Sequence, residues 1–166
     1  MAKYIATIAG QMTEVSGLAT SAGAGDAGKI PQLDGTGRLD ATMMPVGLGA
    51  DTKPITTSEA LAAGDWVNIH NATGAKARKA DATTVGKEAM GFVLAAFGSG
   101  VVATIYFEGT NTQVTGQTPG KVFLSTTAGA GQSSSPTSAG NVEQVIGFAV
   151  SATEVNFQAG STIVRA

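Results

Sequence analysis

The segment GKIPQLDGTGRLDATMMPVGLGADT, residues 28–52, separates a leader of small residues from a body of short apolar segments. Pro31 and Pro45 lack a backbone donor and bias the residue before them away from the helical region, and Pro54 follows closely. The glycines of the segment favour turns. The segment is therefore expected to be extended or turned. The expected organisation is an N-terminal arm at residues 1–27, a junction at 28–54 and a β domain at 55–166.

The composition argues against several classes of partner and site. The 166 residues include 10 lysines and arginines against 12 aspartates and glutamates, a net charge of −2. Nucleic-acid-binding proteins normally carry a basic excess, so nucleic acid is not an expected partner. The chain has no cysteine, which excludes disulfides and thiolate sites. No run approaches the roughly 18 apolar residues of a spanning helix, so a soluble, unexported protein without a membrane partner is expected.

The leader allows two interpretations. Ile5, Ile8, Met12 and Val15 have roughly helical spacing, which favours a short amphipathic helix. Glycines and hydroxyl residues weaken a helix, so an extended arm is equally compatible with the sequence. Residues 17–27 contain too few large apolar groups to bury themselves, and we expect them to be disordered in isolation.

Two ligand motifs are matched only in part. GAGDAGK, residues 23–29, fits a phosphate-binding spacing, but Ile30 replaces the metal-binding hydroxyl and Pro31 obstructs the helix that would hold the phosphate. LDGTGRLD, residues 33–40, lacks the alternating acidic ligands and the closing Glu of a calcium loop. A plain turn is expected there, with the carboxylate of Asp34 bonded to the backbone that follows.

The body is typical of an all-β fold, a small antiparallel barrel or sandwich. Short apolar segments alternate with Gly, Asn and Ser, and no long helical period occurs. The charged loop expected at 71–87 contains Lys76, Arg78 and Lys79, which either blunt a strand edge or contact an acidic partner. Strands are expected at about 66–70, 89–95, 101–108, 121–126, 143–150 and 154–158, with a last one that includes Ile163 and Val164.

An internal repeat predicts two related halves, about 64–109 and 120–160. GDWV at 64–67 aligns with GKVF at 120–123, and TIYF at 104–107 aligns with EVNF at 154–157. Gly91-Phe92 aligns in the same way with Gly147-Phe148. A glycine inside a strand permits a bulge or a tight bend, so both glycines are expected at corners of the fold.

The sequence contains no recognisable catalytic pattern. His70 is the only histidine, the carboxylates are scattered, and no nucleophile elbow occurs. We therefore expect no enzyme activity, no metal, no cofactor and no small-molecule substrate. The strand aromatics, Trp66 among them, are expected in the core, with an exposed sugar-binding platform as the alternative.

Several segments resemble structural proteins of tailed bacteriophages. DAGKIPQLDGTGRLDATMMPVGLGADT is similar to a segment of head decoration (cement) proteins and some fibre proteins, where it joins an N-terminal arm to a β domain. ALAAGDWVNIHN, PGKVFLSTTAGA and EQVIGFAVSATEVNFQAG also resemble the β domains of virion proteins. The resemblance implies a β-tulip-like domain on the outer surface of the phage head, made in the host cytoplasm, trimeric, and bound to the major capsid protein.

This resemblance makes the arm and the junction the expected capsid-binding elements. A tail-fibre or baseplate module, or a carbohydrate-binding β domain, remains the alternative function. The candidate partner-binding residues are Tyr4, Ile5, Ile8, Met12, Val15, Ile30, Leu33, Met43, Met44 and Val46.

Overall fold

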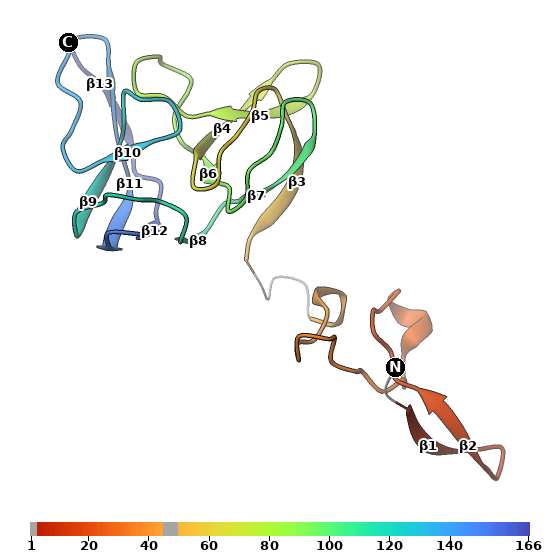
Figure 1. Ribbon diagram of the computed structural model, residues 1–166. Helices are drawn as coiled ribbons and strands as arrows, with labels where there is room; N and C mark the ends of the chain where they lie inside the picture. The colour runs from red at the N-terminus through yellow and green to blue at the C-terminus, as the bar shows by residue number, and fades with distance from the viewer. Residues whose placement is uncertain (1–2, 45–49) are drawn as a thin grey trace. The chain divides into compact units, whose positions relative to one another are not determined.

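The computed structural model describes residues 3–44 and 50–166 (Figure 1). The chain divides into two compact units, Met1–Gly49 and Ala50–Ala166, and the boundary lies inside the expected junction. The architecture is all-β, as predicted, with a closed barrel and open sheets. The described part of the chain contains no helix that is long and apolar enough to cross a bilayer.

The N-terminal unit begins with a β-hairpin, so the helical interpretation is wrong. Strands β1 (Lys3–Ile8) and β2 (Gln11–Ser16) pair antiparallel in register, from Ile8 with Gln11 at the turn to Lys3 with Ser16. The turn residues Ala9 and Gly10 have φ of 49° and 81°. Two positive φ values give the turn a twist that matches the strands, and this local geometry outweighs the helical spacing of the apolar residues.

The rest of the N-terminal unit is irregular but ordered. Two single 3₁₀ turns follow the hairpin, η1 (Ala24–Asp26) and η2 (Ala41–Met43). Leu18 forms a parallel bridge with Pro31, because its amide donates to the carbonyl oxygen of Ile30 and its own carbonyl accepts from the amide of Gln32. Residues 17–27 thus contact the following segment, which the sequence-based expectation of disorder in isolation did not consider.

The first half of the C-terminal unit is a closed five-stranded barrel with the order β3-β5-β4-β6-β7. Strand β3 pairs parallel with β5 and antiparallel with β7, and these contacts close the barrel. The strands are β3 (Thr52–Thr57), β4 (Trp66–Asn71), β5 (Ala75–Lys79), β6 (Gly91–Phe92) and β7 (Val102–Tyr106).

The segment 71–87 was predicted to be a charged loop, but part of it forms strand β5. Lys76, Arg78 and Lys79 lie on a strand between β3 and β4, so they do not blunt a sheet edge. A strand is recognised in a sequence by alternating apolar and polar side chains. In β5 only Ala77 is buried, and because alanine is small and weakly hydrophobic, the pattern was not recognised. Arg78 donates from Nε to Asn68 Oδ1 at 2.9 Å and from a terminal nitrogen to the carbonyl oxygen of Gly86.

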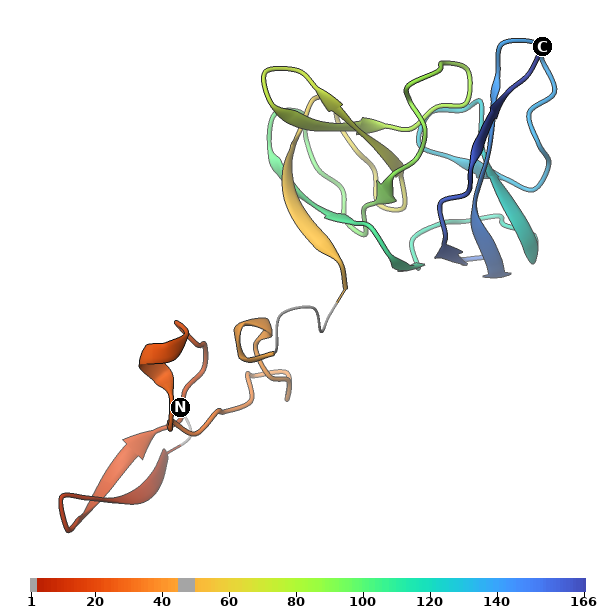
Figure 2. The ribbon, with the colours of Figure 1, turned by 180° about the vertical axis from the view of Figure 1, so that it is seen from behind.

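The second half is an open sheet with the order β10-β9-β11-β12-β8, and β13 pairs with the first part of β11. Figures 1 and 2 show its blue strands beside the yellow and green strands of the barrel. The strands are β8 (Gly109–Asn111), β9 (Gly120–Leu124), β10 (Gly131–Gln132), β11 (Val142–Ser151), β12 (Glu154–Phe157) and β13 (Thr162–Val164).

The two halves follow the same strand path, as the predicted repeat implied, but each begins one strand earlier than the predicted bounds 64–109 and 120–160, with β3 and with β8. β5-β4-β6-β7-β3 corresponds to β10-β9-β11-β12-β8, and Phe92 opposite Tyr106 corresponds to Phe148 opposite Asn156. Gly91 and Gly147 are required in their two halves for the same steric reason. A Cβ on Gly91 would lie 2.5 Å from the carbonyl oxygen of Tyr106, and one on Gly147 would lie 2.0 Å from that of Asn156.

Two hydrophobic clusters hold the unit together. The barrel interior contains small and medium aliphatic side chains, among them Val67, Val93 and Ile105. A second cluster joins the halves, where Trp66 and Phe92 of the first half pack against aliphatic residues of β9, β11 and β12 and against Phe157. All the residues named in both clusters belong to the C-terminal unit, which therefore has a hydrophobic core of its own.

Candidate partner-binding surface

The strand register decides which of the predicted contact residues share a face of the hairpin. Directly opposed residues lie on the same face, and faces alternate along each strand. One face, here called the Met12 face, carries Lys3, Ile5, Thr7, Met12, Glu14 and Ser16. The other, the Tyr4 face, carries Tyr4, Ala6, Ile8, Gln11, Thr13 and Val15. The four residues with helical spacing are thus divided between two faces.

Large apolar side chains of the hairpin are exposed to solvent. Met12 is 82% exposed, Ile5 61% and Ile8 52%, while Tyr4 and Val15 are half-buried. The one ion pair of the described hairpin, between Lys3 and Glu14, lies on the Met12 face at the end away from the turn. Apolar and polar side chains are thus interspersed along the hairpin, with Ile5 opposite Glu14 and Ile8 opposite Gln11.

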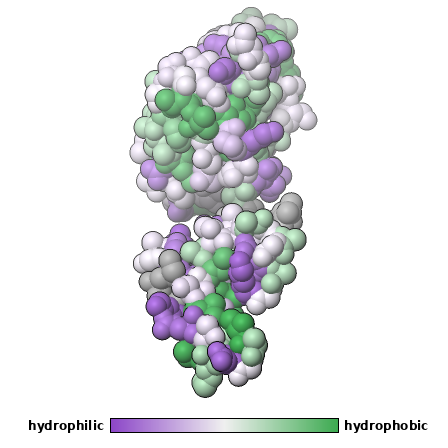
Figure 3. Space-filling model, turned by 90° about the vertical axis from the view of Figure 1, so that its right-hand side faces the viewer, coloured by the Kyte–Doolittle hydropathy of each residue, from purple (hydrophilic) through white to green (hydrophobic). Residues whose placement is uncertain are grey.

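The junction adds a second set of exposed apolar side chains. Ile30, Leu33 and Met44 are each exposed, whereas Met43 on η2 is half-buried. Val46 lies outside the described residues. Leu39 is also exposed but was not among the predicted contacts. Leu33 and Leu39 are the apolar residues on either side of the Asp34 turn. Figure 3 shows hydrophobic atoms reaching the surface of both units.

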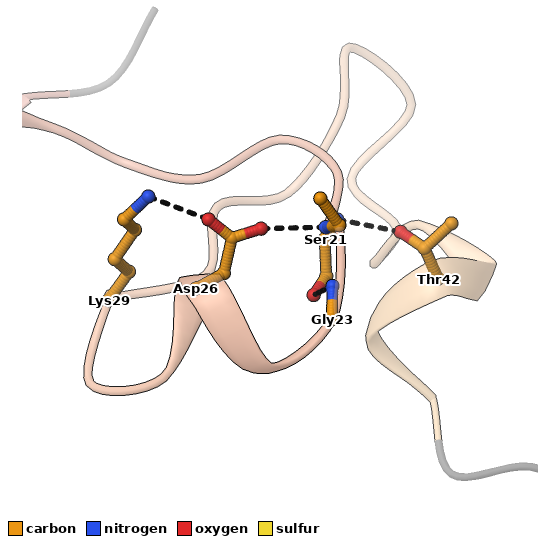
Figure 4. A network of polar contacts seen from close by, with 6 residues as sticks. Ser21, Gly23, Asp26, Lys29 and Thr42 are labelled. Carbon is orange, nitrogen blue, oxygen red and sulfur yellow. Dashed lines mark hydrogen bonds and ion pairs between the residues drawn. The ribbon is translucent and has the colours of Figure 1, made fainter.

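Polar contacts rather than a hydrophobic core order this unit (Figure 4). The carboxylate of Asp26 accepts from the amide of Ala22 and from Lys29 Nζ, both at 2.6 Å, and the bond from Lys29 is the main reason that the pKa of Asp26 is lowered. The amide of Ser21 donates to Thr42 Oγ1 at 2.8 Å, which links the segment after the hairpin to η2. Among the residues of this unit whose burial is described, none is buried.

The predicted plain turn at residues 33–40 is confirmed. Asp34 Oδ1 accepts from the amides of Thr36 and Arg38 and from the hydroxyl of Thr36, and these bonds lower the pKa of Asp34, the Arg38 amide most. Gly37 takes the positive φ, at 79°. Asp40 makes the same kind of contact with Thr42, which lowers the pKa of Asp40. The carboxylate of Asp34 is thus bonded within its own turn.

Ser58 and His70 form a pair that sequence reasoning missed, because they come from separate elements. Ser58 Oγ lies 2.9 Å from His70 Nε2 and 3.2 Å from the carbonyl oxygen of Ala77, to which the hydroxyl donates. A hydroxyl has a single proton, so when Ser58 donates to Ala77 it accepts from the imidazole, and the tautomer of His70 decides which arrangement holds. Burial, and then the charge of Arg78, lower the pKa of His70. This arrangement ties the residue after β3 to β4 and β5.

The aromatic side chains form a core rather than a platform. Trp66 and Phe92 are fully buried, with their ring centroids 5.7 Å apart in an edge-to-face arrangement. Of the strand aromatics, Phe148 is the one that is exposed, at 43%. An exposed sugar-binding platform built on Trp66 is therefore wrong.

A polar cavity of about 340 Å³ lies where the second half stays open. Residues 113–117, which follow β8, and residues 127–131, which lead into β10, form two of its walls, and Ala63–Trp66 forms the third. Within the described residues, no group of three His, Cys, Asp or Glu side chains is placed to hold a metal ion. The exposed apolar hairpin and junction remain the candidate functional surface.

Comparison of the chain with protein-family models, with curated proteins and with solved structures found no match. The virion location, the capsid partner and the trimer therefore stay predictions.

Proposed function

We propose that the protein is a structural component of a tailed-bacteriophage virion that binds the outer surface of the head. Its N-terminal unit contacts the major capsid protein, and its C-terminal unit stands on the shell. The observation that carries this proposal is the contrast between the units. The C-terminal unit buries its own core, whereas none of the N-terminal residues whose burial is described is buried, and Ile5, Met12 and Leu33 are each more than half exposed.

Contact with a partner would stabilise the N-terminal unit. A two-stranded hairpin is marginally stable by itself, and ordering it costs conformational entropy. Full burial of one large aliphatic or Met side chain contributes about 1.5–3 kcal/mol, so burial of Ile5, Ile8 and Met12 on a partner offsets much of that cost. Attachment through several copies would raise the effective concentration, which is the physical advantage of the trimer implied by the resemblance.

The resemblance of residues 26–52 to phage decoration proteins supplies the virion location. It applies to some fibre proteins as well, so a tail module is the competing form of the same proposal. The carbohydrate-binding alternative loses its main support, because Trp66 is buried and Trp66→Ala would test folding instead of sugar binding.

The first test is removal of the N-terminal unit. A protein of residues 50–166 should keep cooperative thermal unfolding, because both hydrophobic clusters lie within it. It should fail to bind purified phage heads that lack the protein, whereas the full chain should bind and appear as density on the shell in cryo-electron microscopy. Equal head binding by both proteins, or density of the full chain on the tail alone, would contradict the proposal.

A further inference from the structure

Three neighbouring strands of the open sheet, β9, β11 and β12, have a second face outside the core (Figure 1). Their inner face packs against Trp66 and Phe92 of the first half. Side chains alternate along a strand, so the intervening residues project to the other side. The second face, here called the Phe148 face, carries Lys121, Phe123, Val145, Phe148, Val150, Glu154 and Asn156.

Apolar side chains at the centre of the Phe148 face are exposed to solvent. Phe148 is 43% exposed and Val150 is 54% exposed. The repeat offers a direct comparison, because Phe92 is the equivalent ring of the first half and is 1% exposed, packed against the second half. The same ring position is thus covered by a neighbouring sheet in one half and open in the other. A surface that covers Phe148 would remove further apolar area from water.

Opposite charges lie on the two sides of β11 on this face. Lys121 of β9 is directly opposite Phe148, and on the other side Asn156 of β12 is opposite the same ring. Glu154 of β12 is opposite Ser151, further along β11. Within the part of the chain that the structure describes, neither Lys121 nor Glu154 belongs to an ion pair. The Phe148 face therefore has an apolar centre with a positive side and a negative side.

We propose that two copies of this chain pair through their Phe148 faces, related by a two-fold axis parallel to β11. Such an axis exchanges the two sides of the face, so Lys121 of each copy comes opposite β12 of the other, where Asn156 and Glu154 lie. An axis across the strands would set Lys121 against Lys121, which charge repulsion disfavours. Two sheets that pack face to face normally keep their strands within about 30° of each other, as this arrangement requires.

The pair is weak and closed. The exposed apolar side chains at its centre are fewer than a stable dimer buries, so the contact belongs to the small, transient class of interfaces and depends on protein concentration. A two-fold contact uses the same patch on both copies, so it ends at two chains and does not propagate. The C-terminal unit makes this contact, which is independent of the proposed capsid binding by the N-terminal unit.

Removal of the apolar centre gives the first test. Sedimentation equilibrium of the full chain, from low micromolar to about 1 mM protein, should show the average mass rise from one chain toward two. Phe148→Ser with Val150→Ser should weaken this association at least about tenfold, because both copies lose buried apolar area. Val101→Ser with Val102→Ser replaces two valines of the barrel half that are 45% and 62% exposed. This matched control should associate as the unchanged protein does.

Reversal of the charges tests the orientation of the pair. Lys121→Glu alone and Glu154→Lys alone should each weaken self-association at least about threefold, because each sets like charges against one another in both contacts. A mixture of these two variants should form mixed pairs, since each then carries the charges that the other lacks. Lys53→Glu, an exposed position on β3, makes the same change in net charge and should leave association unchanged.

Each outcome decides for or against the pair. Far-UV circular dichroism and the thermal midpoint verify that every variant is folded. If the full chain keeps the mass of one chain at 1 mM, or if its association survives the loss of Phe148 and Val150, the proposal is wrong. If the two charge variants do not associate when mixed, the two-fold arrangement is wrong. None of these results alters the test of capsid binding, in which the N-terminal unit is removed.

Discussion

The two halves of the C-terminal unit follow the same strand path but end differently. In the first half, β3 is six residues long and reaches β5, where Thr56 and Thr57 pair with Lys76 and Ala77. In the second half, the corresponding strand β8 ends after three residues at Asn111 and never reaches β10. One half is therefore a closed barrel and the other an open sheet.

The difference follows from what fills each interior. The barrel is filled by its own, mainly aliphatic, side chains, whereas the open sheet packs against Trp66 and Phe92 of the first half. The chain at Gly64 to Trp66 lies between the end of β8 and the start of β10, where the open half lacks strand pairing. Asn111 Nδ2 donates to the carbonyl oxygen of Gly64 at 2.9 Å, and the amide of Trp66 donates to the carbonyl oxygen of Gly129. The open half is complete only when the first half is folded.

The largest contrast is expected at the repeated phenylalanine. Phe92→Ala removes a ring that is 1% exposed, and it should lower the free energy of unfolding by about 3–5 kcal/mol. Phe148→Ala, at the equivalent position of the second half, removes a ring that is 43% exposed and should cost less than about 1 kcal/mol. Urea denaturation of the two variants measures both values. Equal losses would mean that the halves are not packed as described.

The repeated glycines should both resist substitution, and Gly147 more than Gly91. Gly147→Ala places a Cβ 2.0 Å from a carbonyl oxygen at a φ of 149°, and Gly91→Ala places one 2.5 Å from a carbonyl oxygen. Backbone must move in both, so each variant should lose about 1–3 kcal/mol or more. Gly98→Ala, where a Cβ meets nothing within 4 Å, is the control. If Gly147→Ala has the same thermal midpoint as Gly98→Ala, the steric clash described for the repeated glycines is wrong.

The closing strand provides a smaller contrast. Thr57 is buried and donates to the carbonyl oxygen of Gly98 at 2.7 Å, so Thr57→Val leaves that oxygen without its donor and should cost about 1–2 kcal/mol. Thr115 occupies the corresponding place beyond β8 and is exposed, so Thr115→Val should change stability by less than about 0.5 kcal/mol. Chemical denaturation followed by Trp66 fluorescence compares the pair, and similar losses would show that both halves are closed in solution.

The smallest effect is expected from acid on the N-terminal unit. The pKa values of Asp26, Asp34 and Asp40 are lowered from 3.8 by hydrogen bonds that need the ionised carboxylate. Groups with a lowered folded-state pKa stabilise the fold above 3.8, and this contribution is lost as the pH falls below that value. NMR signals of the Thr36 and Thr42 amides should shift there while those of β9, which contains no acidic residue or histidine, stay in place. Unchanged Thr36 and Thr42 signals at pH 2 would contradict the assignment.

The fold class and the repeat could be predicted because alternating apolar residues and the Gly-Phe pairs repeat at a fixed spacing. Strand β5 was missed because Ala77 is its single buried side chain, and β3 because Pro54 was taken as part of the junction. The hairpin was missed because Ala9-Gly10 is not a typical turn pair. The candidate contact residues were found by hydropathy alone, but their division between two faces depends on register, which the leader sequence did not reveal.

The open sheet has one further consequence, for behaviour at high concentration. A free strand edge exposes backbone donors and acceptors, and a long one recruits strands from other molecules. Here the outermost strands β10, β8 and β13 are two, three and three residues long. Such short edges offer little template for strand-to-strand aggregation. The C-terminal unit can therefore keep an unclosed sheet and still remain dispersed when many copies are crowded together.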